Sequence, residues 1–199
     1  MNIIKKIKNF LTFLVLCLLL IIPTKADDIK DFEIEGMSIG DSLLKYMNKS
    51  QIEANKYPVI RGGKKFYEVQ KVISNIKSDI YEDIFLYFKN DDPDKIILAI
   101  AGRNYYENNI DECYGLQKTI VSEMEKIFPN IEKTDRGKVK LTAFPNGNSY
   151  RKLNSFFFEE GGHVQVGCYD YSIKDTSSTD RLSVVIFSQQ YEDWYRSLK

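Results

Sequence analysis

The N-terminal 26 residues constrain the fold of this chain most, because they decide in which compartment the remaining residues fold. Lysines at positions 5, 6 and 8 precede an apolar run from Phe10 to Ile22, and Thr24-Lys25-Ala26 offers small residues before a cut at Asp27. A helix of this length would span only ~20 Å of a hydrocarbon core about 30 Å thick. We therefore predict that residues 1–26 are a cleaved signal peptide, with a signal-anchor helix as the alternative.

Removal of this leader changes the charge of the chain. The precursor has 28 basic and 28 acidic residues, and the leader holds four lysines and no acid, which leaves residues 27–199 with a net charge of −4. The remaining lysines are dispersed along the sequence. Nucleic acids and anionic membrane surfaces need a basic footprint, so we predict neither as a partner. No second apolar run is long enough to span a membrane after cleavage.

Cleavage also changes the cysteine count. Cys17 lies inside the leader, which leaves Cys113 and Cys168. In the periplasm or outside the cell an even pair is typical of a disulfide, whereas in the cytosol it is typical of two free thiols. We predict a disulfide between Cys113 and Cys168, with two buried thiols as the alternative.

The segment that follows Asn109 has the clearest helical pattern. Asn109 suits an N-cap, and Pro129 marks the stop after Phe128. Apolar residues recur in steps of three and four and form one stripe: Ile110, Cys113, Leu116, Ile120, Met124 and Ile127. This pattern predicts a long helix with Cys113 facing the core.

Around Cys168 the pattern changes to alternation. Val164, Val166 and Cys168 share one face of a predicted strand, while Tyr169 and Tyr171 share the other. If the valine face packs on the helix, the bridge joins helix to sheet. Closing the separation of 55 residues would stabilise the fold by about 4 kcal/mol in the chain-entropy model.

The rest of the chain predicts strands with short connections. Two apolar segments, 84–88 and 96–101, flank a turn with Pro93 and form the clearest hairpin. Further strands are predicted at 66–72, 138–144, 150–159, 163–173 and 182–188, and short helices near residues 38–41 and 50–53. Short connections indicate antiparallel neighbours. We predict one α+β domain over 27–199: an antiparallel sheet with one long helix packed on a face, plus short N-terminal helices.

Candidate chemistry is sparse. The only histidine, His163, follows Glu159 and Glu160 closely, a set that could bind a metal or form an acid–base pair. Glycines between them indicate an exposed turn, and no second histidine completes a zinc site. The acidic turn at 91–94 lacks the glycine and distal glutamate of an EF-hand loop. We predict no metal site, no cofactor and no catalytic residue.

Aromatic residues are the remaining signal. They form 13% of the chain and cluster at 105–106, 169–171 and 191–195. Exposed Tyr and Trp suit protein interfaces and sugar faces, whereas strands also favour aromatics for packing alone. Tyr169 and Tyr171 are the pair that we expect to face away from the helix.

A distinctive motif opens the predicted mature chain: Asp31-Phe32-Glu33-Ile34-Glu35-Gly36-Met37-Ser38-Ile39-Gly40-Asp41-Ser42-Leu43-Leu44. It resembles the opening of a family of small exported proteins from marine bacteria. Cys113 and the run Val166-Gly167-Cys168-Tyr169-Asp170 are similar to later landmarks of that family. The resemblance implies a single-domain exported protein with two recurring cysteines and no known catalytic residue. More distantly, Gly36-Met37-Ser38 resembles the start of small outer-membrane assembly lipoproteins and β-lactamase-inhibitor-like modules.

Two classes of function follow. The first is a non-catalytic module, periplasmic or secreted, that binds a protein, an envelope component or a small ligand. The alternative is an envelope hydrolase that uses paired carboxylates, for which Glu159, Glu160 and His163 are the only local cluster.

Overall fold

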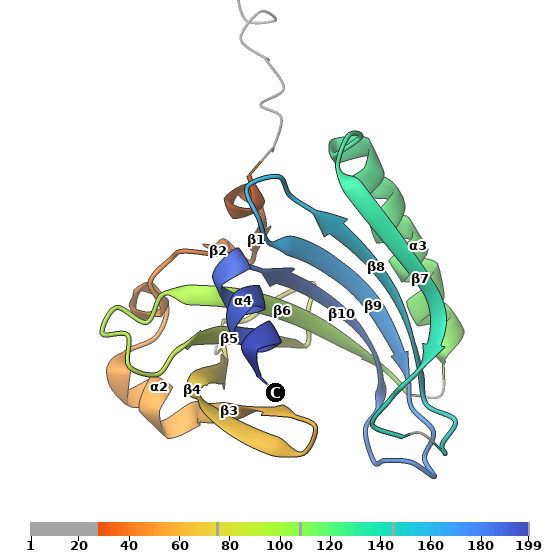
Figure 1. Cartoon of the computed structure of the whole chain (residues 1–199), viewed down its shortest axis with the longest axis horizontal. Coiled ribbons are helices and arrows are strands. Elements are labelled where there is room, and N and C mark those ends of the chain that lie inside the picture. The colour runs from red at the N-terminus through yellow and green to blue at the C-terminus, as the bar shows by residue number, and fades with distance from the viewer. Residues whose placement is uncertain (1–27, 75, 108, 145, 199) are drawn as a thin grey trace, which may run out of the picture.

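One antiparallel sheet of eight strands dominates the structure, a computed structural model that describes residues 28–74, 76–107, 109–144 and 146–198. The predicted leader lies outside these residues. The order across the sheet is β3-β4-β5-β6-β10-β9-β8-β7 (Figure 1). The strands of this sheet are β3 (Lys56–Arg61), β4 (Lys64–Ile73), β5 (Asp83–Lys89), β6 (Ile97–Tyr106), β7 (Glu132–Lys140), β8 (Tyr150–Phe157), β9 (His163–Asp170) and β10 (Asp180–Phe187).

Helices and a small hairpin complete the described elements. They are η1 (Ile29–Asp31), β1 (Glu33–Ile34), β2 (Met37–Ser38), η2 (Leu43–Lys45), α2 (Lys49–Asn55), α3 (Ile110–Ile127) and α4 (Gln189–Ser197). The class α+β with an antiparallel sheet is thus confirmed, and the sheet is its larger part. No helix in the described ranges has both the length and the apolar character needed to cross a membrane.

The order of the strands results from one long crossover. The chain leaves the centre of the sheet after β6, passes through α3 to the far edge at β7, and returns by β8 and β9. β10 then pairs with both β9 and β6, with Val185 opposite Ala101. The sheet is bent, and α4 lies inside the bend (Figure 1).

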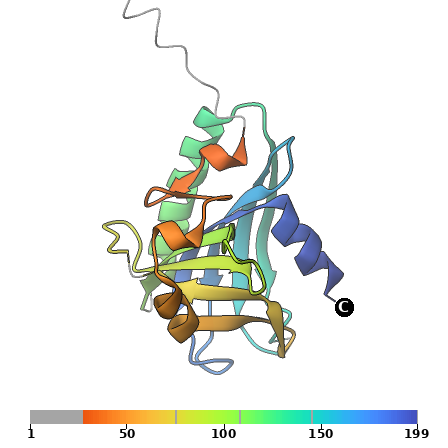
Figure 2. The same ribbon diagram turned by 90° about the vertical axis from the view of Figure 1, so that its left-hand side faces the viewer.

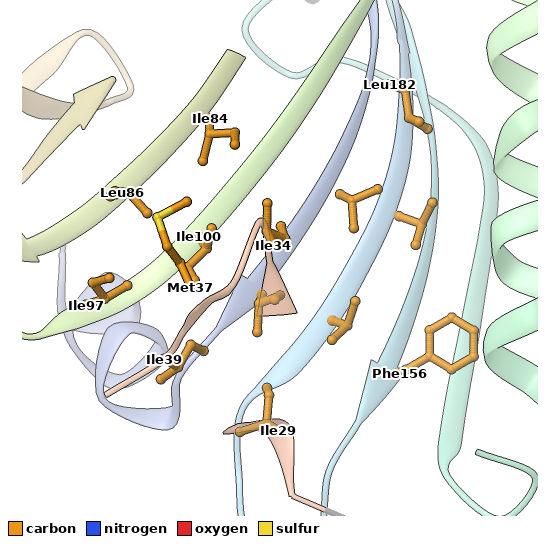
Figure 3. Close-up of a cluster of buried hydrophobic side chains, with 14 of the residues drawn as sticks. Ile29, Ile34, Met37, Ile39, Ile84, Leu86, Ile97, Ile100, Phe156 and Leu182 are labelled. Atoms are coloured by element: carbon orange, nitrogen blue, oxygen red, sulfur yellow. The ribbon is translucent and has the colours of Figure 1, made fainter. Parts of the chain in front are cut away.

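The two faces of the sheet have different covers. Figure 2 shows α3 and the N-terminal segment on one side and α4 on the other. The side with α3 holds the main core, where side chains of the central strands meet the segment of residues 29–47 (Figure 3). Met37 and Leu43 are completely buried there, so this segment closes the part of the face that α3 leaves open.

The apolar stripe of α3 differs from the prediction. The helix begins after Asn109 and ends at Ile127, close to the predicted bounds, but the Asn109 side chain makes no capping hydrogen bond and instead donates to Oε2 of Glu112. Leu116 and Ile127 of the predicted stripe are exposed. The buried positions are Cys113, Gln117, Val121 and Met124. Gln117 is accommodated because its Nε2 donates hydrogen bonds to the backbone oxygens of Lys152 (2.8 Å) and Val166 (3.0 Å). The polar residue that shifts the stripe is therefore paired with carbonyl groups of the sheet.

The disulfide joins Cys113 of α3 to Cys168 of β9, with 6.0 Å between their Cα atoms. Both residues are fully buried. Val164, Val166 and Cys168 face the main core with α3, as the alternation predicts. The bridge therefore connects the first turn of the crossover helix to the middle of the sheet.

Most predicted strands are present with shifted ends, and several elements were missed. The β5–β6 hairpin is confirmed, with Phe85 opposite Ala101. β7 begins six residues before the predicted start at 138. The prediction contained neither β3 nor α4, and it also lacked η1 and the small β1–β2 hairpin. Near the N-terminus, the capping box of α2 uses Asn48 and Gln51 instead of the predicted Ser50 and Glu53.

Candidate functional site

A pocket of about 380 Å³ lies on the side of the sheet that carries α4, and we call it the concave pocket. Its lining extends from β3 and β4 across the sheet to β8, and α4 forms one wall. Four of the lining residues are cations: Lys71, Arg103, Arg151 and Arg181. Among the described residues that line it, Glu192 is the one carboxylate. The pocket is therefore strongly basic, although the predicted mature chain is acidic.

Strand register brings these cations together. Arg181 on β10 and Arg151 on β8 are both direct neighbours of Tyr169 on β9. Arg103 on β6 lies opposite Ser183, two residues along β10 from Arg181, which makes the two arginines diagonal neighbours. Four strands thus each contribute one cation to the same face.

Aromatic rings support the cationic groups. The Arg103 guanidinium lies 4.0 Å from the centroid of Phe85, and the Lys71 ammonium lies 5.5 Å from the same ring. The Arg181 guanidinium lies 4.8 Å from the centroid of Tyr169 and 5.1 Å from that of Tyr171. Contacts of this kind hold a cation in place and leave its N–H groups free for another partner.

The arginines lack protein partners at a buried atom. The Nε atoms of Arg103, Arg151 and Arg181 are buried and have no hydrogen-bond partner among the described residues. Nor does any ion pair found within those residues involve these arginines or Lys71. Four cationic side chains therefore converge on one pocket without an ion pair to any described carboxylate, and their concentration of positive charge is what the pocket offers to an anion.

Lys71 responds to the same concentration of charge. Burial lowers the pKa of its ammonium below 10.5, and the nearby Arg103 and Arg181 lower it further. A bound anion would oppose both effects, because it would favour the charged lysine.

The other end of the pocket is close to neutral. His163 is buried between the rings of Phe157 and Phe187, with centroid distances of 5.3 and 4.7 Å. Its Nδ1 lies 3.7 Å from Oε1 of Glu192, whose Oε2 accepts from Arg196. Burial lowers the pKa of His163 below 6.5, against the attraction of Glu192. The single carboxylate is therefore already paired outside the arginine cluster.

The wall formed by α4 is attached to β3. Arg61 Nη1 donates hydrogen bonds to the backbone oxygens of Tyr195 and, at 2.9 Å, Leu198, and its guanidinium lies 4.4 Å from the Tyr195 ring. Tyr191 packs on Tyr87 with ring centroids 5.5 Å apart. These contacts hold α4 against the bent sheet.

The residues singled out from the sequence fall in several places. Glu159 and Glu160 are exposed on the turn before β9 and line a different hollow from His163. Asp92 in the acidic turn accepts hydrogen bonds from backbone N–H groups of residues 94 and 96. In the described part of the chain, no group of three His, Cys, Asp or Glu residues is placed to hold a metal ion.

Two of the aromatic clusters contribute side chains to the concave pocket. Tyr169 and Tyr171 face away from α3 as predicted, and their rings stack with centroids 6.2 Å apart. They are half-buried, and Arg181 lies against both. Tyr191 and Tyr195, beyond the last predicted strand, line the pocket from α4.

Sequence reasoning missed the four cations. Consecutive members of the set lie 30 to 48 residues apart in the sequence, so no local basic run marks them. One signal was present, since Arg103 directly continues the apolar run that forms the centre of β6. A charged residue that continues a buried strand is a candidate for a pocket.

Comparison with known proteins finds no family model that matches this chain and no curated protein with significant sequence similarity.

Proposed function

We propose that this protein is an exported, non-catalytic binding module, and that the concave pocket holds a small anionic ligand. The observation that carries the proposal is the convergence of Lys71, Arg103, Arg151 and Arg181 on one pocket, with no ion pair to a carboxylate among the described residues. A carboxylate or phosphate would interact with several of these cations at once, because guanidinium groups bind such oxygens in pairs.

The pocket supports binding more than hydrolysis. A hydrolase of the paired-carboxylate class needs two carboxyl groups on opposite sides of the scissile bond. Among the described lining residues the concave pocket has only Glu192, and its Oε2 is engaged by Arg196. Glu159 and Glu160 line the other hollow.

Export is supported by two independent features. The first 26 residues have the composition of a signal peptide. The bond between Cys113 and Cys168 is of the kind that persists in oxidising compartments. A periplasmic or secreted location is therefore part of the proposal.

Isothermal titration calorimetry with citrate and inorganic phosphate tests this function. We expect binding to the mature chain at low salt, and a loss of about 10- to 100-fold in affinity for Arg103→Gln or Arg181→Gln, since each removes a charge-assisted hydrogen bond. Lys118→Gln is the control for the loss of one positive charge, because Lys118 is exposed on α3, on the other face of the sheet (Figure 2), and does not line the pocket. Circular dichroism must show that all variants are folded. Anion binding that is absent, or that Lys118→Gln weakens as much as the pocket variants do, would refute the proposal.

A further inference from the structure

The concave pocket is lined by uncharged hydroxyl groups as well as by cations. Tyr87, Tyr169, Tyr191, Tyr195 and Ser183 all line it. They come from four elements, β5, β9, β10 and α4. This set lies around the arginine cluster and extends from it to the wall formed by α4.

These hydroxyls have spare hydrogen-bonding capacity. In the described part of the chain, the tyrosine hydroxyls that bond to protein groups are those of Tyr46 and Tyr105, both outside the pocket lining. Burial raises the pKa of Tyr87 and of Tyr191, so both hydroxyls stay protonated and able to donate. Gln165 adds an amide whose one side-chain contact, to Ser155, is long at 3.4 Å.

The floor of the pocket leaves room for a ligand beside these groups. Ser183 lies opposite Arg103, and Ala101 is opposite Val185 in the adjacent row. The central positions are thus small, while the long cationic and aromatic side chains surround them. A volume of about 380 Å³ is near the lower end of the range for small-molecule sites.

We propose that the ligand is an acidic sugar, whose carboxylate or phosphate binds Arg103, Arg151 and Arg181 while its ring hydroxyls bond to Ser183, Gln165 and the tyrosines. This inference rests on the proposed function and adds the class of ligand. Tyr rings offer apolar faces to sugar C–H groups and their hydroxyls offer partners to sugar oxygens.

An apolar anion fits the same pocket poorly. Its ring would displace water from Tyr87, Ser183 and Gln165 without replacing the hydrogen bonds. Sites that are built to bond a ligand hydroxyl reject the analogue that lacks it, because the polar groups of the site are left unpaired. The hydroxyl lining therefore selects for a hydroxylated anion.

Three probe ligands separate charge from hydroxyl recognition: glucuronate, which has both; cyclohexanecarboxylate, which keeps the charge and the six-membered ring; and glucose, which keeps the hydroxyls. We expect calorimetry to show glucuronate binding at least tenfold more tightly than either of the others. Glucose 6-phosphate, measured in parallel, shows whether carboxylate or phosphate is preferred, and the inference requires the preferred sugar acid to bind more tightly than both glucose and cyclohexanecarboxylate. Equal affinities for glucuronate and cyclohexanecarboxylate, both lost in Arg103→Gln, would overturn the sugar and leave anion binding intact. Binding of none of the acids would overturn both.

Two hydroxyl deletions give a second test. Tyr87→Phe and Ser183→Ala each remove one oxygen and retain the rest of the side chain. Each should weaken glucuronate binding about two- to tenfold and not weaken cyclohexanecarboxylate binding, because only the sugar uses the hydroxyl. Tyr67→Phe is the control, since Tyr67 is exposed on β4 and does not line the pocket. A uniform loss for both ligands, or none for either, would contradict hydroxyl recognition.

Discussion

Removal of the disulfide gives the most quantitative test of how this fold is stabilised. Cys113 lies in the first turn of α3 and Cys168 in β9, and the loop that their bond closes contains the rest of α3 with β7 and β8. For a separation of 55 residues, the chain-entropy model assigns about 4 kcal/mol to the restriction of the unfolded chain. Breaking the disulfide should therefore lower the free energy of unfolding by about 4 kcal/mol.

The prediction is best tested with a mutant cycle. Cys113→Ala, Cys168→Ala and the double variant all lack the bond, so all three should lose about the same 4 kcal/mol, apart from ~1 kcal/mol for each deleted buried sulfur. With an m-value of about 2 kcal/mol/M, urea midpoints should fall by about 2 M. Fluorescence of Trp194, the only tryptophan, and far-UV circular dichroism follow the same transition.

If the losses of stability in the two single variants added up to the loss in the double variant, this reasoning would be refuted. If the cysteines were two free thiols, each single variant would lose only its own packing contribution, and the double variant would lose about the sum. A thiol titration of the denatured, unreduced protein would then count two reactive groups. Treatment of the wild type with a reductant provides the control, because it should reproduce the instability of the double variant without any substitution.

Three further predictions follow from burial and space. Because burial holds the pKa of His163 below 6.5, this histidine binds a proton more readily in the unfolded chain than in the folded one. The free energy of unfolding should therefore fall as pH decreases from about 7.5 to 5.5. In urea unfolding, His163→Phe should remove the part of this pH dependence that His163 causes, and an unchanged pH dependence would contradict the prediction. Gly102→Ala should lower the free energy of unfolding by about 1–3 kcal/mol, since the new Cβ would lie 2.6 Å from the ring of Tyr81. The control Gly115→Ala places its Cβ where no atom lies within 4 Å, so thermal unfolding should show it to be neutral or stabilising. Because its pKa is lowered, Lys71 loses its proton at a lower pH than an ordinary lysine does, so calorimetry should show citrate affinity falling as pH rises toward 10.5, and falling less in Lys71→Gln. Identical pH profiles would exclude Lys71 from the site.

Local pattern predicted the elements that interact mainly with their neighbours in sequence. The β5–β6 hairpin was predictable because two apolar runs flank a turn with Pro93. The start and end of α3 were predictable from Asn109 and Pro129. Its buried face was not, because Gln117 counts as polar in any periodicity, and only the carbonyl groups of β8 and β9 make its burial favourable.

β3 and α4 were missed for different physical reasons. β3 pairs with the adjacent β4 through the two-residue turn Gly62-Gly63, but its burial pattern is irregular and a register shift interrupts the pairing, so simple alternation does not mark it. α4 carries few aliphatic residues and depends on the aromatic contacts of Tyr191 and on the contacts of Arg61 with its C-terminal end. The contacts of Arg61 with α4 join residues more than 130 positions apart, so they have no signature in a short window of sequence.

The amino-acid sequence by itself determined the class of fold, the inward faces of Cys113 and Cys168, and the expectation of an exported chain, because periodicity, turn residues and leader composition are local properties. Tertiary structure alone decided the site. Pairing of β10 with β6 brings Arg181 beside Arg103, which lies 78 positions earlier in the sequence, and the meander of β8 and β9 adds Arg151. Because charges act through space and not along the chain, a mature chain predicted to be acidic overall can still present a basic pocket.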